Sequence, residues 1–550
     1  MHFIRVKFFH TDSSPYICLG LKQNETMKTL SRLLPVLLLA ACGHGGLDPD
    51  RSRSVDLSGI GHEMIVLGEK LDDPYSLENM TLAVRSLYPE KAVRLDLHPT
   101  DIYVRFLPED DVQFERLEAL GLELVDHPLD RRIIREGDYY QDPEIGEGRI
   151  TWQYAVVPSD FSFPKGILCE VLDECYIAEN DAHTRADGID WRAVERESFR
   201  LTGNAGLLSP HTRAEGESYA PSGRITVRDE ESDGGTPSGL SGVKVCVNSF
   251  VKFATAFTDD EGFYEIPKSF SEDVRYRLVF RNRRGFAIGV NLVLVPASMS
   301  TLGKHSPEGI DVTVDRESDW KLFTRCSVNN ATAAYFDRCA GTGDVSAPPS
   351  NLRIWIFRSL GASSTPMLQQ GVLVDSGKLG EFLGDYADLV KMFLPDITLG
   401  LKHCHDYASI YSETVHELSH ASHFVQAGKE FWGRFVRFVL RSYVTSLGIT
   451  YGTGMEEDAG YCEVGEMWGY FFGNLLFRAR YGRGTPAEGL TQWFYPQILM
   501  YLEDRGVGAA KIFSVLGPDV VGRDAFQEAL SDQYPEHYSV IQQAFDRYRY

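Results

Sequence analysis

The stretch YSETVHELSHASHFVQAG, from Tyr411 to Gly428, contains three histidines and two glutamates within the pattern of a single helix. Polar residues open it, apolar residues recur through it, and Gly428 is a typical helix stop. His416 and His420 are four residues apart, so both imidazoles stand on one face of the helix. The stretch therefore predicts a pair of metal ligands on one helix.

Residues His416 to His420 read HELSH and fit the pattern H-E-x-x-H. In this pattern the two histidines hold Zn²⁺, and the glutamate is the general base that takes a proton from water. Glu417 follows His416 directly, so it can reach a water molecule on the metal without being a ligand itself. The alternative interpretation is an ordinary polar helix, which would usually lack a third ligand downstream.

The third ligand cannot come from the metzincin continuation of the motif. That continuation requires a glycine and a histidine where this chain has His423 and Gln426. A glutamate on a second helix is the alternative source. The apolar stretch GYCEVGEMWGYFFGNLLF, Gly460 to Phe477, contains two candidates, Glu463 and Glu466.

Glu466 is the preferred third ligand. It lies on one helical face with Gly469 and Gly473, and these small residues would let the helix approach the two histidines closely. Glu463 lacks such small neighbours, so we expect it to form a hydrogen bond that orients a metal ligand. A role for Glu463 as the third ligand in place of Glu466 also stays open. A buried carboxylate in either position needs a partner.

The sequence EMWGY from Glu466 resembles the segment around the ligand glutamate of gluzincin metallopeptidases. The resemblance implies a zincin-like domain in which His416, His420 and Glu466 bind Zn²⁺ and Glu417 is the catalytic base. It implies hydrolysis of peptide bonds in a peptide or protein substrate, as an endopeptidase. Tyr470 replaces the aspartate that thermolysin-like enzymes place there.

No residue that would stabilise the transition state stands out in the sequence. Four candidates are open, namely His423, Tyr451, Tyr461 and Tyr470. Another histidine-containing segment, HCHD from His403 to Asp406, has no matching ligand set and is expected to be structural.

The segment MKTLSRLLPVLLLAACGHGG, Met27 to Gly46, has a basic start, a short apolar core and small residues before Cys42. The apolar run is too short to span a bilayer, which favours a signal peptide. The end of the segment resembles a bacterial lipobox, which implies export and a lipid anchor to a membrane at Cys42. Gly43 favours an outer membrane. Residues 1–26 are expected to be a non-native upstream extension.

The chain has 550 residues and a formal net charge of −23. This length predicts two to four domains. The acidic balance argues against nucleic acid as a partner, because binding it requires a basic face. Seven cysteines follow Cys42, and two pairs are close enough in sequence to be candidate disulfides: Cys169 with Cys175, and Cys326 with Cys339.

The central region reads as short strands separated by turns, which indicates a small sandwich. TDDEGFYEI (Thr258 to Ile266), after SGVKVCV, resembles the carboxypeptidase regulatory-like β-sandwich, an accessory domain of the transthyretin-like or Ig-like type. Before it, a strand at Asp101 to Pro108 and a helix at Glu109 to Leu120 indicate a small α+β module. After it, helices dominate, and an isolated strand at Leu352 to Phe357 is expected to be an edge strand that pairs with substrate.

The expected fold class is therefore a multidomain α+β protein with a mainly helical C-terminal domain that contains a minor sheet. The expected parts are the signal peptide (27–41), the lipidated cysteine and tether (42–56), the α+β module (57–145), a connector and linker (146–221), the β-sandwich (222–291) and the zincin-like domain (292–550). The competing functional hypothesis is a non-catalytic surface lipoprotein, a binding or scaffold module that keeps a zincin fold without turnover.

Overall fold

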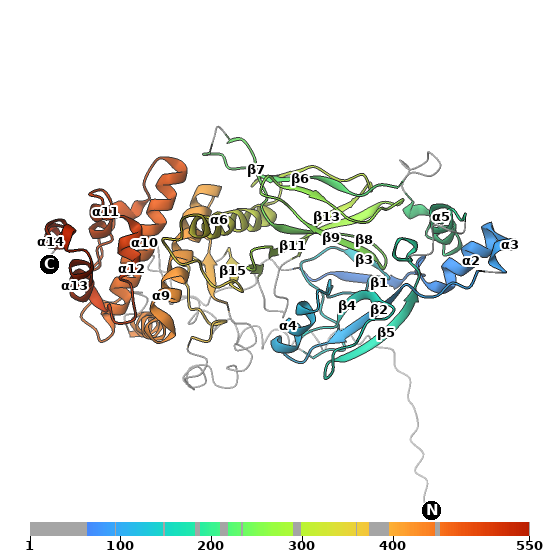
Figure 1. Cartoon of the computed structure of the whole chain (residues 1–550), viewed down its shortest axis with the longest axis horizontal. Helices are drawn as coiled ribbons and strands as arrows, with labels where there is room; N and C mark the ends of the chain where they lie inside the picture. The colour runs from blue at the N-terminus through green and yellow to red at the C-terminus, as the bar shows by residue number, and fades with distance from the viewer. Residues whose placement is uncertain are drawn as a thin grey trace, which may run out of the picture.

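The computed structural model describes residues 63–93, 95–146, 149–181, 188–208, 218–232, 235–289, 299–358, 360–372, 395–445 and 451–548. The predicted signal peptide, Cys42, the tether and the upstream residues 1–26 lie outside them. Within the described residues the chain is a mixed α/β protein with several sheets, eleven α-helices and a helical C-terminal region (Figure 1). None of the helices in this part of the chain combines the length and apolar character needed to cross a bilayer.

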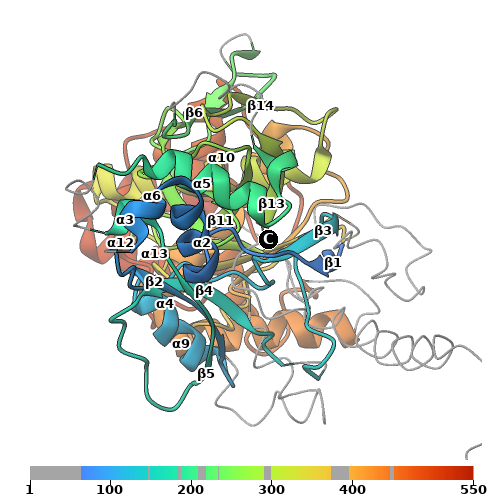
Figure 2. The same cartoon turned by 90° about the vertical axis from the view of Figure 1, so that its right-hand side faces the viewer.

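The N-terminal unit combines a three-stranded sheet of order β4-β2-β5, a two-stranded sheet and short helices. Its elements are β1 (Val66–Lys70), α2 (Leu77–Leu87), α3 (Pro89–Ala92), β2 (Asp101–Leu107), α4 (Asp111–Ala119), β3 (Arg131–Arg135), β4 (Gln153–Pro158), β5 (Leu168–Cys175) and α5 (Trp191–Leu201). Helices α2 and α5 pack side by side at one end of the molecule (Figure 2). The predicted strand and helix between residues 101 and 120 are confirmed as β2 and α4. Asp110 begins α4 by accepting a hydrogen bond from the Gln113 backbone N–H at 2.8 Å.

The expected connector between residues 146 and 221 contains regular structure. Strands β4 and β5 both lie in it and pair with β2 on either side, and α5 follows them. Most side chains of β5 are exposed. An edge strand of this kind lacks the alternation of apolar and polar residues that marks a strand in sequence, which is why the sequence predicted a connector.

Residues 222–314 form what we call the two-sheet region, whose sheets share one apolar core. Its strands are β6 (Ser222–Val227), β7 (Ser238–Gly239), β8 (Val243–Ser249), β9 (Lys252–Phe257), β10 (Phe263–Glu265), β11 (Val274–Asn282), β12 (Ala287–Gly289), β13 (Met299–His305) and β14 (Val312–Val314). One sheet contains β6, β7, β10 and β14, and the other contains β8, β9, β11, β12 and β13. The turn after β9 leads into β10 on the other sheet.

Strand pairing crosses the boundary predicted at residue 291. Strand β13 pairs with β11 and β14 pairs with β6, so two strands beyond that boundary complete the two-sheet region. Strand β12 also pairs in parallel with β15 (Arg353–Phe357), which pairs in parallel with β16 (Ile397–Gly400). The strands of the C-terminal region therefore continue the sheet of the two-sheet region.

The predicted edge strand is wrong in one respect. The strand exists as β15, but it has β12 on one side and β16 on the other, so it is an interior strand. The outer side of β16 bonds to Ser364, whose backbone exchanges two hydrogen bonds with Thr398 at 2.7 and 2.8 Å. The mostly apolar sequence of β15 is consistent with an interior, parallel strand.

The helical C-terminal region lies at the end of the molecule opposite to α2 and α5 (Figure 1). Its helices are α6 (Trp320–Thr342), α9 (Tyr407–Thr445), α10 (Ala459–Tyr481), α11 (Gln497–Glu503), α12 (Ala509–Ser514), α13 (Gly522–Gln533) and α14 (Tyr538–Arg547). Helices α9 and α10 make the most extensive contact, and α6 packs on α9. The apolar core of this region is continuous with that of the two-sheet region.

Neither candidate disulfide is formed. All seven cysteines of the described residues are free thiols. Cys326 and Cys339 lie on the single helix α6, and thirteen residues of helix separate them by about 20 Å. Cys169 and Cys175 lie on the single strand β5, where six residues also span about 20 Å. A disulfide requires Cα atoms within about 7 Å, so closeness in sequence was misleading here.

Candidate metal centre

Helix α9 presents His416 and His420 on its buried face. Asp406 caps the helix start by accepting the Ser409 backbone N–H at 2.8 Å. The helix is interrupted at Gly428, where φ is 84° and ψ is 171°, so the predicted stop is a break between two helical halves. His416 is 4% exposed and His420 1% exposed. The two rings project from consecutive turns, as positions i and i+4 require.

Helix α10 crosses this face and brings Glu466 to the histidines. A Cβ atom on Gly469 would lie 2.6 Å from His420 Cε1, and one on Gly473 would lie 3.2 Å from the His416 Cα. Any side chain at Gly469 would therefore displace the His420 ring. The two glycines allow the close approach that the sequence predicted for them.

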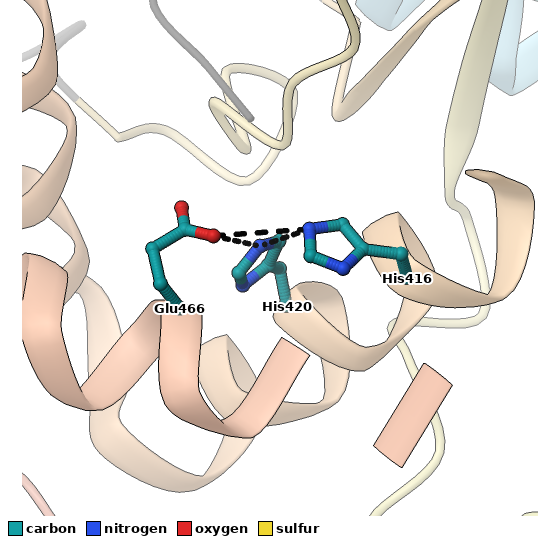
Figure 3. A group of neighbouring side chains, drawn as sticks. All are labelled: His416, His420 and Glu466. Carbon is teal, nitrogen blue, oxygen red and sulfur yellow. Dashed lines mark hydrogen bonds and ion pairs between the residues drawn. The ribbon is translucent and has the colours of Figure 1, made fainter. Parts of the chain in front are cut away.

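Three ligand atoms converge between the helices. His416 Nε2 lies 3.1 Å from His420 Nε2, and Glu466 Oε2 lies 3.8 and 3.6 Å from these two atoms (Figure 3). Zn–N and Zn–O bonds of 2.0–2.2 Å in a tetrahedron place ligand atoms about 3.3–3.6 Å apart. The observed distances of 3.1–3.8 Å bracket this range, and all three residues are buried. The group therefore has the chemistry and the spacing to hold a metal ion.

Glu417 lies beside this group and is held by a residue from a distant segment. The Thr365 hydroxyl donates to Glu417 Oε2 at 2.6 Å, and it is also 3.0 Å from the Glu417 carbonyl oxygen. The Thr365 carbonyl accepts the indole N–H of Trp432 at 2.7 Å. Both Thr365 and Glu417 are buried. The orientation of the Glu417 carboxylate is therefore determined by a hydrogen bond inside the protein.

Glu463 is placed away from the histidines. Its carboxylate accepts the backbone N–H of Arg523 at 2.9 Å and forms an ion pair with the Arg523 guanidinium at 2.8 Å. This pair joins α10 to the start of α13. Glu463 and Glu466 are one turn apart on α10, yet only Glu466 belongs to the group of metal-ligating side chains.

Two of the four candidates for stabilising a transition state lie next to the centre. The Tyr470 ring packs on His416, with ring centroids 4.5 Å apart, and the Tyr470 hydroxyl is 3.5 Å from the Tyr451 hydroxyl. Tyr461 instead packs on Phe431, with centroids 4.9 Å apart.

His423 is also directed away from the ligand atoms. Its ring is fully buried against Phe431 and Trp432, at centroid distances of 5.0 and 5.6 Å. Burial, together with the charge of nearby His420, lowers the pKa of His423 to about 3. A ring in this environment is a neutral packing element, which agrees with the sequence-based view that His423 is not a ligand. The HCHD segment likewise joins no group of metal-ligating side chains among the described residues.

Thr365 is the residue at this centre that sequence reasoning missed. It lies in the segment GASSTPM, Gly361 to Met367, 52 positions before Glu417. No spacing rule relates the two residues, because the contact depends on how this segment folds against β16 and α9.

Comparisons with known protein families, with curated proteins and with solved structures find no match to this chain.

Proposed function

We propose that this protein is a zinc-dependent peptidase of the gluzincin type, in which His416, His420 and Glu466 hold Zn²⁺ and Glu417 is the general base. The observation that carries the proposal is the convergence of His416 Nε2, His420 Nε2 and Glu466 Oε2 beside Glu417. Two histidines and one glutamate are a ligand set of catalytic zinc sites that keep a position for water or substrate. A structural zinc site would have four protein ligands.

When bound, a zinc ion would polarise the peptide carbonyl and lower the pKa of a water molecule towards neutrality. Glu417 accepts the proton of that water and delivers it to the departing amine, so one carboxylate acts first as base and then as acid. The Thr365 hydroxyl fixes the direction of the Glu417 carboxylate through its 2.6 Å hydrogen bond. Thr365 therefore positions the base without contacting substrate.

The proposal extends to location and organisation. The lipobox resemblance at Cys42 supports an exported, lipid-anchored protein, in keeping with the peptide substrates proposed for the centre. The two-sheet region has the short strands and shared core expected of the carboxypeptidase regulatory-like accessory domain. We place the chemistry entirely in the C-terminal region, because all residues of the centre come from the segments between Thr365 and Glu466.

Metal content and peptide cleavage test this proposal together. Purified protein is analysed for bound metal by mass spectrometry and for cleavage of casein or a fluorogenic peptide library. We expect zinc in the wild type, retained zinc in Glu417→Gln with cleavage reduced by a factor of about 10²–10⁴, and loss of both in Glu466→Gln. Glu430→Gln is the matched control, since Glu430 is an exposed glutamate on the same helix.

Each other outcome has a definite meaning. Wild-type protein that binds no zinc, or that binds iron instead, would contradict the zinc centre. Zinc binding without cleavage of any peptide would favour the non-catalytic lipoprotein. Undiminished cleavage by Glu417→Gln would remove Glu417 from its role as base.

A further inference from the structure

A pocket lies at the carboxyl ends of two adjacent parallel strands. Arg358 follows β15 directly, and Leu401 and Lys402 follow β16 directly; all three line the pocket. Arg316, which precedes α6, and Trp320, the first residue of α6, also line the pocket. In open α/β sheets, ligands bind in the crevice outside the carboxyl ends of parallel strands. The pocket occupies that position in this sheet.

The pocket is basic although the chain is strongly acidic. The chain has 55 Lys and Arg against 78 Asp and Glu. The pocket lining nevertheless contains Arg316, Arg358, Lys402 and His405 against one carboxylate, Glu317. This local excess of positive charge distinguishes the pocket from the average surface of the protein.

Two of these cations, Arg358 and Lys402, form no ion pair with any of the described residues. Arg316 forms an ion pair with Glu230 at 3.3 Å. Among the described residues, no carboxylate lies within ion-pair distance of Arg358 or Lys402. Partial desolvation lowers the pKa of Arg358, and no neighbouring charge offsets this effect. An anion in the pocket would relieve that cost.

The pocket also has an aromatic wall. The Arg358 guanidinium lies over the Trp320 ring, 5.3 Å from its centroid, which holds the guanidinium plane against the wall. A planar guanidinium with several N–H donors matches the oxygens of a carboxylate or a phosphate in pairs, and the lysine adds a point charge.

We propose that this pocket is a binding site for a small oxyanion-bearing ligand, in which Arg358 and Lys402 hold the phosphate or carboxylate group and Trp320 contacts its apolar part. The pocket has a volume of about 370 Å³, which is enough for one anionic group attached to a single ring. The site shares no residue with the candidate metal centre. It therefore stands whether or not the protein is a peptidase.

Calorimetric titration with four probes tests the site. Phenyl phosphate and inorganic phosphate represent phosphate ligands, benzoate represents carboxylates, and phenol is the uncharged control. We expect at least one anion to bind, phenol not to bind, and the affinity to fall as salt is raised, because the interaction is between charges. Stronger binding of phenyl phosphate than of benzoate would identify the phosphate class, and the reverse would identify the carboxylate class.

The variants Arg358→Gln and Lys402→Gln identify where the anion binds. Each is expected to weaken binding by about tenfold, equal to about 1.4 kcal/mol. Lys165→Gln, a change at an exposed lysine far from the pocket in sequence, is the matched control and should bind as the wild type does. Circular dichroism checks that each variant is folded.

Two results would overturn the proposal. One is the absence of anion binding by the wild type up to about 10 mM, a concentration that would reveal even weak affinity. The other is unchanged affinity in the variant that carries both substitutions. The wild-type titration is decisive by itself if a variant fails to fold.

Discussion

Two groups of polar side chains, one around Lys252 and one around His416 and His420, lie in different regions of the molecule and differ in composition. The first contains a cation, and the second does not include a lysine or an arginine. At the junction of the N-terminal unit and the two-sheet region, Lys252 is 1% exposed and pairs with Glu179 at 3.0 Å and Glu195 at 3.2 Å. Burial alone would lower the pKa of Lys252, but these carboxylates raise it. In this group the negative charge of the carboxylates is therefore compensated by the lysine itself.

The group at the candidate metal centre consists of side chains that can act as metal ligands. It consists of two imidazoles and a carboxylate whose ligand atoms converge within 3.1–3.8 Å. The difference separates two reasons for burying polar groups. The Lys252 group joins two parts of the fold, whereas the histidine group could hold a metal ion. The predictions below test that distinction, from the largest expected effect to the smallest.

Lys252→Met should destabilise the protein by about 3–5 kcal/mol, because it leaves the buried Glu195 carboxylate without its cation. Urea unfolding measures the loss. Lys70→Met is the control, since Lys70 is 69% exposed and its pair with Asp130 is solvated; it should cost about 1 kcal/mol or less. If Lys252→Met lowered the free energy of unfolding by no more than Lys70→Met does, the charge of Lys252 would not stabilise the junction. Metal content should be unchanged in both variants.

Gly469→Ala should weaken metal binding by about 100-fold or more, because the new methyl group displaces the His420 ring. Competition with a chelator of known affinity measures the effect. Gly465→Ala, one turn earlier on α10, is the matched control. There the added Cβ would lie 3.2 Å from the Phe435 ring and would not meet a ligand side chain directly. Equal metal affinity in the two variants would contradict the close approach of α10 to His420.

Thr365→Val should lower kcat by about tenfold, which corresponds to one hydrogen bond of about 1.4 kcal/mol, and should leave metal content unchanged. Removing a hydrogen bond to the charged carboxylate raises the pKa of Glu417, so the acid limb of the pH–rate profile should move to higher pH. Thr365→Ser keeps the hydroxyl and should restore both kcat and the profile. A Val variant with a normal profile would leave Thr365 with a packing role only.

Asp73→Asn should change the pH dependence of stability, with an effect of a few degrees in Tm. Burial, followed by nearby carboxylates, raises the pKa of Asp73 to about 8 from 3.8. The folded protein then keeps a proton that the unfolded chain releases, so stability present below about pH 4 is lost as pH rises towards 8. The Asn variant lacks this loss. The Tm of the Asn variant minus the Tm of the wild type should therefore be larger at pH 8 than at pH 4.5. The same Tm difference at both pH values would contradict the raised pKa of Asp73.

Local sequence patterns were sufficient wherever structure depends on neighbours along the chain. Strand β2, helix α4 and the interruption of helix at Gly428 follow the patterns read from sequence. The approach of Glu466 to the two histidines was predictable because helical periodicity aligns it with Gly469 and Gly473.

Contacts between residues that lie far apart in the sequence could not be predicted from local patterns. The interior position of β15 results from its contact with β12, about 65 residues earlier, and no local pattern reports it. The ion pair that holds Glu463 away from the histidines is made with Arg523, which lies 60 residues after it. Thr365 reaches Glu417 only because its segment bonds to β16. Sequence spacing contains no signal for any of these three contacts.

The parallel pairing of β12 with β15 has a consequence for how this chain can be divided. A fragment that began after the two-sheet region would leave one side of β15 with unpaired backbone N–H and C=O groups, and such an edge invites aggregation. The apolar core shared by both regions would be split as well. We therefore expect the helical region and the sheets before it to fold and unfold together.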